Sequence, residues 1–258
     1  MRSMTRLLLS VLPLLTGCSY FLQPPPPSFE VKGTQIAYDG PITSAFLMQL
    51  LEAVTPETTE LMIRSSGGDG HAAYRIAEVI QNHRLKVTVT GPCISACSML
   101  FPAGQKKTVL PGGYLGYHWN NQTRTETTAE RLRIGEASAF QVALEREVED
   151  SFNASVGVRQ ALYDDAWLLV QARLNQHPVA RWLSALRGDP IPVWIPTPEE
   201  LACYGLHVDE FWFPQAGDLQ QLPFRFRIGP DLFTSRDLRT VPKGTSTCVG
   251  TGMMPSRG

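Results

Sequence analysis

The sequence predicts an α/β fold built on a mostly parallel sheet, and two observations lead to this prediction. From Phe29 to residue 90, short β-rich runs alternate with amphipathic helical runs. Strands joined by crossover helices at this spacing favour parallel pairing. The chain also has 258 residues, 43% of them hydrophobic, which is enough to bury one large core.

The first half of the chain should contain three strands, each followed by a helix. The expected elements are a strand over 31–38, a helix over 46–54, a strand over 61–63, a helix over 72–80, a strand over 87–90 and a helix that starts near Ser95. In open parallel sheets, functional groups gather where strands end and helices begin. The loop at 65–70 and the turn at 91–97 are therefore the first places to look for a site.

The amino-terminal residues have the pattern of a bacterial export signal. Two arginines precede an apolar run over 7–15, which is too short to span a bilayer. The run ends in Thr16-Gly17-Cys18, which resembles the lipobox of bacterial lipoproteins, so lipid attachment is expected at Cys18. Ser19 favours outer-membrane over inner-membrane sorting, on the periplasm-facing side. The alternative is an ordinary signal peptide that happens to contain a cysteine.

The rest of the chain sets the expected domain boundaries. After Asn120 the sequence becomes mostly helical, and beyond Pro214 it loses clear periodicity. The expected organisation is a signal peptide over 1–17, a proline-rich tether over 18–28, one α/β domain over 29–213 with a helical insertion over about 124–190, and a C-terminal extension over 214–258.

Charge excludes one class of partner. The formal net charge is −1 and the sequence pI is about 6.5, so the sequence lacks the basic footprint of a nucleic-acid-binding protein. Membrane affinity should come from lipid at Cys18 rather than from a basic surface. A homo-oligomer remains open.

Three features could together form a catalytic site. Ser95 lies where a strand gives way to a helix, and a helix N-terminus suits a nucleophile whose reaction develops an oxyanion. His118 follows a short β-like run and could act as the general base. Gly67-Gly68 could bring bare backbone N–H groups close to a substrate carbonyl. Each feature has a simpler reading, as a helix cap, a satisfied core histidine and an ordinary turn.

Residues 29–118 resemble the proteolytic subunit of the Clp protease and its signal peptide peptidase relatives, which share the ClpP/crotonase fold. The loop Ser65-Ser66-Gly67-Gly68 looks like their Ser-Pro-Gly-Gly loop, and the block from Gly91 to Gly104 matches their nucleophile segment without a gap. The resemblance implies a spiral of β-β-α units, with Ser95 as nucleophile and His118 as base. It also implies an oxyanion hole formed by Gly68 and Ala96.

The third member of the family's triad departs from this pattern. Residues 197–206, which end in Tyr204-Gly205-Leu206, resemble the helix that follows the family's catalytic aspartate. Counting back from Tyr204-Gly205, the position of that aspartate falls on Val193, which cannot orient a histidine. Asp189 is the candidate substitute. Asp164, Asp165 and Asp209 are weaker candidates, and a backbone carbonyl could also hold the imidazole. Loss of the orienting carboxylate lowers the rate steeply, so a slow dyad and an inactive relative both remain open.

The cysteines predict two disulfides. Apart from Cys18, the chain has four cysteines, an even number for an oxidising compartment. The favoured pairing joins Cys93 to Cys97, on either side of Ser95, and Cys203 to Cys248. The alternative is that Cys93 and Cys97 are small buried thiols, and Cys97 is a second candidate nucleophile. No metal site is expected, because no histidine pair has suitable spacing, and no cofactor is expected.

The sequence therefore predicts a lipid-anchored serine hydrolase that works without ATP, most simply a peptidase on peptide or protein substrates. The first alternative is a catalytically weak or inactive lipoprotein of the same fold that serves as a binding or assembly scaffold. The second is coenzyme A thioester chemistry, which the parent fold also hosts.

Overall fold

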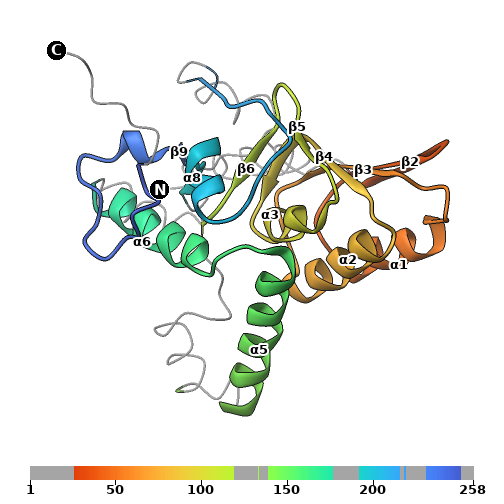
Figure 1. Ribbon diagram of the computed structural model, residues 1–258, viewed down its shortest axis with the longest axis horizontal. Helices are drawn as coiled ribbons and strands as arrows, with labels where there is room; N and C mark the ends of the chain where they lie inside the picture. Colours follow the sequence, from red (N-terminus) through yellow and green to blue (C-terminus); the bar gives the residue numbers. More distant parts are fainter. Residues whose placement is uncertain are drawn as a thin grey trace, which may run out of the picture.

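The computed structural model describes residues 26–118, 133, 139–176, 192–215, 218 and 231–250. Its main sheet has seven strands in the order β1-β2-β3-β4-β5-β8, with β6 paired to β4. Only β1 and β2 pair antiparallel, and every other pair in the sheet is parallel. The predicted α/β class with a mostly parallel sheet is confirmed (Figure 1).

Strands dominate the first half of the chain, and longer helices follow in the second half. The strands are β1 Ser28–Lys32, β2 Gln35–Asp39, β3 Glu60–Ser65, β4 Lys86–Ile94, β5 Lys107–Val109, β6 Tyr114–Gly116, β7 Val193–Trp194, β8 Glu210–Phe211 and β9 Leu232–Phe233. The helices are α1 Ser44–Ala53, α2 Gly70–Asn82, α3 Ala96–Leu100, α5 Ala139–Val156, α6 Ala161–Gln176 and α8 Pro198–Cys203, with short 3-10 turns at η3 Phe101–Ala103 and η4 Ser235–Asp237.

Two strand predictions need correction. The single strand expected over 31–38 is an antiparallel hairpin, because Gly33 adopts a positive φ of 60° and turns the chain between β1 and β2. The strand expected to stop at Thr90 continues through Gly91-Pro92 to Ile94. Proline is tolerated there because the β3–β4 register shifts between Ile63 and Ser65, and bulges accept residues that cannot donate to the ladder.

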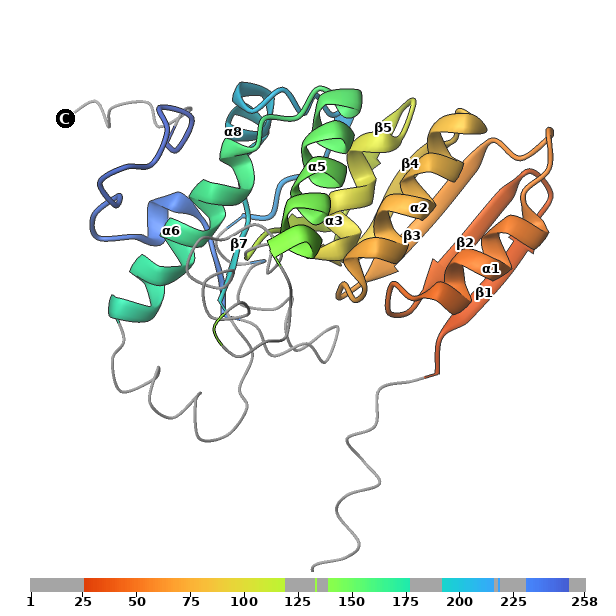
Figure 2. The ribbon, with the colours of Figure 1, turned by 90° about the horizontal axis from the view of Figure 1, so that it is seen from below.

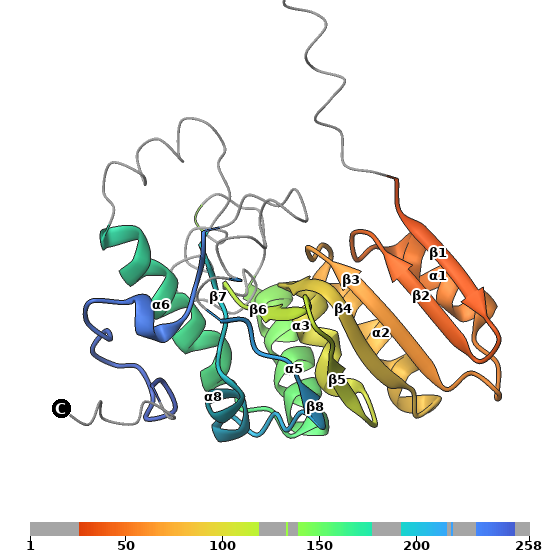
Figure 3. The same ribbon diagram turned by 90° about the horizontal axis from the view of Figure 1, so that it is seen from above.

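The helices of the first half cover one face of the sheet. From below, α1, α2 and α3 lie in front of the strands (Figure 2), and from above the strands lie in front of the helices (Figure 3). The predicted apolar stripe of α2 is buried, with Ile76 and Ile80 at 0% exposure. Asp69 caps this helix by accepting a hydrogen bond of 2.8 Å from the His71 N–H.

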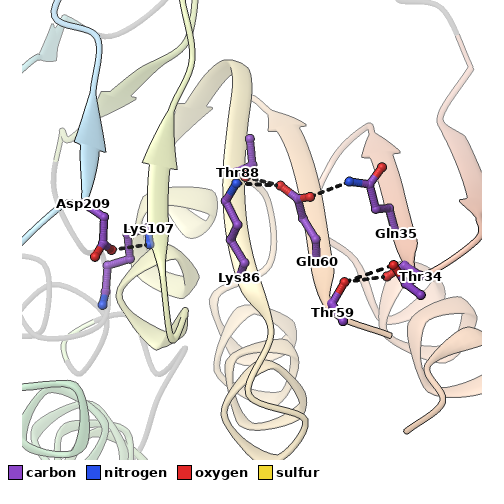
Figure 4. A network of polar contacts seen from close by, with 8 residues as sticks. All are labelled: Thr34, Gln35, Thr59, Glu60, Lys86, Thr88, Lys107 and Asp209. Atoms are coloured by element: carbon purple, nitrogen blue, oxygen red, sulfur yellow. Dashed lines mark hydrogen bonds and ion pairs between the residues drawn. The ribbon is translucent and has the colours of Figure 1, made fainter. Parts of the chain in front are cut away.

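A polar network ties the strands together at their amino-terminal ends (Figure 4). Glu60 accepts hydrogen bonds from Gln35 Nε2 at 2.6 Å and Thr88 Oγ1 at 2.5 Å, and Lys86 Nζ lies 3.3 Å away. Burial raises the pKa of Glu60, but these donors more than offset that effect and leave the pKa below its usual value. The candidate site lies at the other, carboxyl-terminal ends of these parallel strands. The network therefore stabilises the sheet without entering that site.

The second half adds helices and a small second sheet. Helix α5 projects away from the main sheet (Figure 1). The apolar row predicted through residues 132–148 is exposed where it is described, with Phe140 at 76%, Leu144 at 50% and Val148 at 40%. Its remaining member, Leu132, lies outside the described residues. None of the helices in the described ranges is long and apolar enough to cross a membrane.

The C-terminal extension packs back onto the helical half. Strand β9 pairs with β7, and a disulfide joins Cys203 to Cys248, as predicted. The buried Glu200 accepts hydrogen bonds from Ser235 Oγ at 2.6 Å and the Gly250 N–H at 2.8 Å. Residues 231–250 are therefore part of the packed structure, although their sequence shows no periodicity.

Candidate active site

Ser95 occupies a strained turn between a strand and a helix. Strand β4 ends at Ile94 and helix α3 starts at Ala96, and Ser95 between them has φ 57° and ψ −122°. Within the described ranges only one other non-glycine residue, Arg84, has a positive φ. Such conformations cost of order 1–3 kcal/mol and concentrate at functional sites. A sharp strand-to-helix turn of this kind presents a nucleophilic hydroxyl clear of the sheet.

Hydrogen bonds and a disulfide hold this turn in place. The Gly116 carbonyl accepts from the Ser95 N–H at 3.0 Å and lies 3.0 Å from Ser98 Oγ. Ser98 Oγ is also 2.8 Å from the Ser95 carbonyl, so its single hydroxyl proton is shared between two acceptors. The bond between Cys93 and Cys97, the other predicted pair, spans the turn. The hydrogen bonds to the Gly116 carbonyl fix the turn to strand β6, and the disulfide closes the turn on itself.

His118 lies two residues beyond the end of β6 and faces the same cavity as Ser95. The cavity has room for roughly one water molecule, about 10 Å³, and both residues line it. Burial lowers the pKa of His118 to about 4, because a charged imidazolium is poorly solvated there. The imidazole is therefore neutral at physiological pH, which is the form that can accept a proton.

The glycine loop after β3 lies directly against the nucleophile turn. A Cβ on Gly67 would lie 2.8 Å from both the Ser95 Cβ and the Ile94 carbonyl oxygen. A Cβ on Gly68 would lie 2.2 Å from the Ile42 carbonyl oxygen, and both glycines have positive φ, at 104° and 148°. Only glycine fits at either position. The loop therefore brings its backbone next to Ser95.

The predicted oxyanion donors come from this loop and from α3. The Gly67 N–H donates to Ser65 Oγ at 3.1 Å, which leaves the Gly68 N–H as the loop donor for an incoming carbonyl. The Ala96 N–H belongs to the first turn of α3, where backbone N–H groups have no acceptor within the helix. Ser95, Gly68 and Ala96 thus come from adjoining segments.

Val193 lies opposite His118. Tyr117 and Trp194 form an antiparallel bridge with two backbone hydrogen bonds of 2.8 Å. In an antiparallel register the next residues along each segment, His118 and Val193, face each other. Val193 is 3% exposed and its Cγ1 lies within 2.6 Å of where a Gly116 Cβ would be. The position that the family resemblance assigns to an aspartate therefore adjoins His118 but carries an apolar side chain.

Of the proposed substitutes for that aspartate, Asp164 is an exposed residue of α6, and the others accept hydrogen bonds elsewhere or lie outside the described residues. Asp189 is outside them. Asp165 accepts a hydrogen bond of 2.5 Å from the Tyr204 hydroxyl. Asp209 accepts one of 2.8 Å from the Lys107 N–H, at the far edge of the sheet (Figure 4).

The remaining cavity wall comes from residues that sequence reasoning did not identify. They belong to α3, to the segment after β6 and to α6, and they are Ser98, Met99, Tyr117, Tyr163 and Ala166. The sequence of α6 predicts a helix and nothing more, and no motif marks Tyr163 or Ala166. Their role arises from the packing of α6 beside the nucleophile turn, which periodicity does not encode.

Within the described ranges, no group of three or more His, Cys, Asp or Glu side chains is placed to hold a metal ion.

No family model matches the chain, and no curated protein matches it. Among solved structures, a mutant of ClpP1 from Listeria monocytogenes is similar to the chain. It has 22% sequence identity and a TM-score of 0.35, over 48% of this chain and 72% of that one.

Proposed function

We propose that the protein is a serine hydrolase of the bacterial cell envelope that cleaves peptide bonds through an acyl-enzyme at Ser95. The observation that carries the proposal is the strained turn of Ser95, whose side chain shares a small cavity with the neutral His118. A structural N-cap serine would not require a positive φ, since N-cap residues ordinarily adopt extended conformations.

The chemistry follows from this arrangement. His118 takes the proton of the Ser95 hydroxyl as its Oγ attacks the substrate carbonyl carbon. The negative charge that develops on the carbonyl oxygen is stabilised by the backbone N–H groups of Gly68 and Ala96. His118 then delivers the proton to the leaving amine. Water hydrolyses the resulting ester by the same route in reverse.

A fluorophosphonate probe tests this proposal directly. Incubation of the full chain with its disulfides intact should give a covalent adduct, and peptide mapping should locate it on Ser95. Ser95→Ala should abolish the adduct, whereas Ser151→Ala, which changes an exposed serine on α5, should leave it unchanged. Equal labelling of wild type and Ser95→Ala would refute the proposal.

A second candidate function is a binding or assembly scaffold without catalysis, and Val193 opposite His118 favours it. The position where the resemblance expects an aspartate carries a valine, whose side chain can neither accept a hydrogen bond from an imidazole nor stabilise its charged form. A folded wild-type protein that fails to label at any pH between about 4 and 9 would support this candidate. Labelling of Ser95 at an ordinary rate would exclude it.

We also propose that lipid on Cys18 anchors the protein to the periplasmic side of the envelope, in the outer membrane in preference to the inner. The support is the order of two arginines, an apolar run and Thr16-Gly17-Cys18 in the sequence. Metabolic labelling with an alkyne fatty acid should mark the wild type and not Cys18→Ala. Density-gradient separation of the two membranes would show where the labelled protein resides.

A further inference from the structure

The cavity beside Ser95 limits the size of the group that a substrate can place there. Its free volume of about 10 Å³ leaves room for roughly one water molecule. In the described ranges, the five residues that line it besides Ser95 and His118 are all buried, and none is more than 7% exposed. They are Ser98, Met99, Tyr117, Tyr163 and Ala166.

Most of this wall is fixed by the surrounding structure. Tyr117 is tied to Trp194 by two backbone hydrogen bonds of 2.8 Å, and its ring contacts those of Trp194 and Tyr163 at centroid distances of 6.4 and 6.1 Å. Ser98 Oγ lies within 3.0 Å of two backbone carbonyls. Neither residue can withdraw from the cavity without breaking these contacts.

Met99 is the adaptable part of the wall. Its side chain is unbranched and has three rotatable bonds, whereas the tyrosines are held by their rings and Ala166 has no side-chain torsion to adjust. The packing density of a protein interior leaves little slack behind such residues. The depth available to a substrate therefore depends mainly on Met99.

Resting on the function proposed above, we propose that the site selects acyl donors in which the group next to the reacting carbonyl carbon is small. For peptides, this means glycine, alanine or serine at the residue that supplies the scissile carbonyl. For esters it means acetyl. In the reaction, Ser95 Oγ bonds to the carbonyl carbon, the bond to the leaving amine or alcohol breaks, and the serine proton passes through His118 to that leaving group. The acyl part of the substrate remains esterified to Ser95 until water removes it as an acid.

A chain-length series of p-nitrophenyl esters tests this selectivity on the full chain. After subtraction of the rate of Ser95→Ala, kcat/KM for the acetate should exceed that for the octanoate by at least about 100-fold, because methylenes that do not fit carry a large penalty. Fluorogenic peptides that differ only at the residue before the scissile bond should rank alanine far above leucine and phenylalanine.

Two methionine variants test whether Met99 sets the size limit of the cavity. Met99→Ala should raise kcat/KM for the octanoate relative to the acetate about tenfold, because it removes the flexible wall. Met48→Ala is the matched control, since Met48 lies on α1 and is 55% exposed. It should leave the ratio at its wild-type value.

The possible failures can be told apart. Ser95-dependent hydrolysis of the octanoate as fast as the acetate would overturn the selectivity while leaving the serine hydrolase intact. Absence of both fluorophosphonate labelling and Ser95-dependent ester hydrolysis would overturn both. The ester series on the wild type needs only Ser95→Ala as its blank, so it decides the question even if Met99→Ala is unstable.

Discussion

The protonation of His118 should determine the pH at which Ser95 loses its reactivity. Lowering the pH protonates the imidazole, and only the neutral imidazole can accept the hydroxyl proton. Burial places the pKa of His118 at about 4. Its ordinary value is about 6.5. The acidic limb of the pH–rate profile should therefore lie well below that of a solvent-exposed catalytic histidine.

The size of the effect can be worked out at pH 5. A histidine with a pKa of about 4 is ~90% neutral there, whereas one with an ordinary pKa is only ~3% neutral. The two cases differ about 30-fold in the fraction of competent base. A difference of this size lies well outside the scatter of a labelling assay.

The same shift affects stability and gives a second readout. The unfolded chain binds the proton more tightly than the folded chain, so the contribution is fully present above about pH 6.5 and is lost as the pH falls towards 4. The loss amounts to at most about 3 kcal/mol. Denaturant unfolding at each pH should follow this decline, and it shows at which pH the labelling data refer to folded protein.

The assay is the second-order rate of fluorophosphonate labelling at Ser95 between about pH 3.5 and 8. His118→Gln should lower the rate and flatten the profile. His83→Gln is the control, because His83 is exposed at the end of α2, and should leave the profile unchanged. A proton NMR titration of the His118 ring gives the pKa independently of catalysis. Midpoints near 6.5 in both experiments would refute the reasoning.

Three further predictions concern the frame of the site. Gly67→Ala should abolish Ser95 labelling and cost about 2 kcal/mol or more of stability, because its Cβ would lie 2.8 Å from that of Ser95 at a positive φ; unchanged labelling would contradict the loop placement. Replacing Cys93 and Cys97 by serine should lower the free energy of unfolding by about 2 kcal/mol, because the disulfide closes a short loop and restricts the unfolded chain. It should also slow the labelling of Ser95 by loosening the turn, and equal labelling rates would show that the disulfide does not position the nucleophile. Glu200→Gln should lower stability by about 3 kcal/mol, since an amide cannot accept from all of its donors, Ser235 among them, and an unchanged midpoint would argue against the buried network.

The sequence was informative where chemistry is local. Alternating strands and helices predicted the parallel sheet. The spacing of Cys93 and Cys97 around Ser95 predicted one disulfide, and the even number of cysteines left Cys203 and Cys248 as the second pair. It failed at Gly33, which turns a single predicted strand into a hairpin, and at Pro92, which was expected to end a strand. In both cases the pairing partner decides what the backbone does, and a single strand's sequence does not reveal its partner.

The site could be predicted only in part for the same reason. Ser95 and His118 were identifiable from motif order, but the strained φ of Ser95 depends on how β4 and α3 meet. Tyr163 and Ala166 enter the cavity wall because α6 packs there, more than 40 residues along the chain from His118. Contacts of this kind depend on tertiary packing, which overrides local propensity.

Because β9 pairs with β7, the packing around His118 needs a segment that is synthesised late. Leu232 and Phe233 pair with Val193 and Trp194, and Trp194 bridges the residue before His118. A nascent chain that has not yet emerged as far as residue 233 has no partner for β7. Cys248 emerges later still and needs an oxidant to bond with Cys203. The segments that pack around His118 are therefore completed last, and a chain kept in a reducing compartment would carry Ser95 and His118 without the Cys203–Cys248 disulfide.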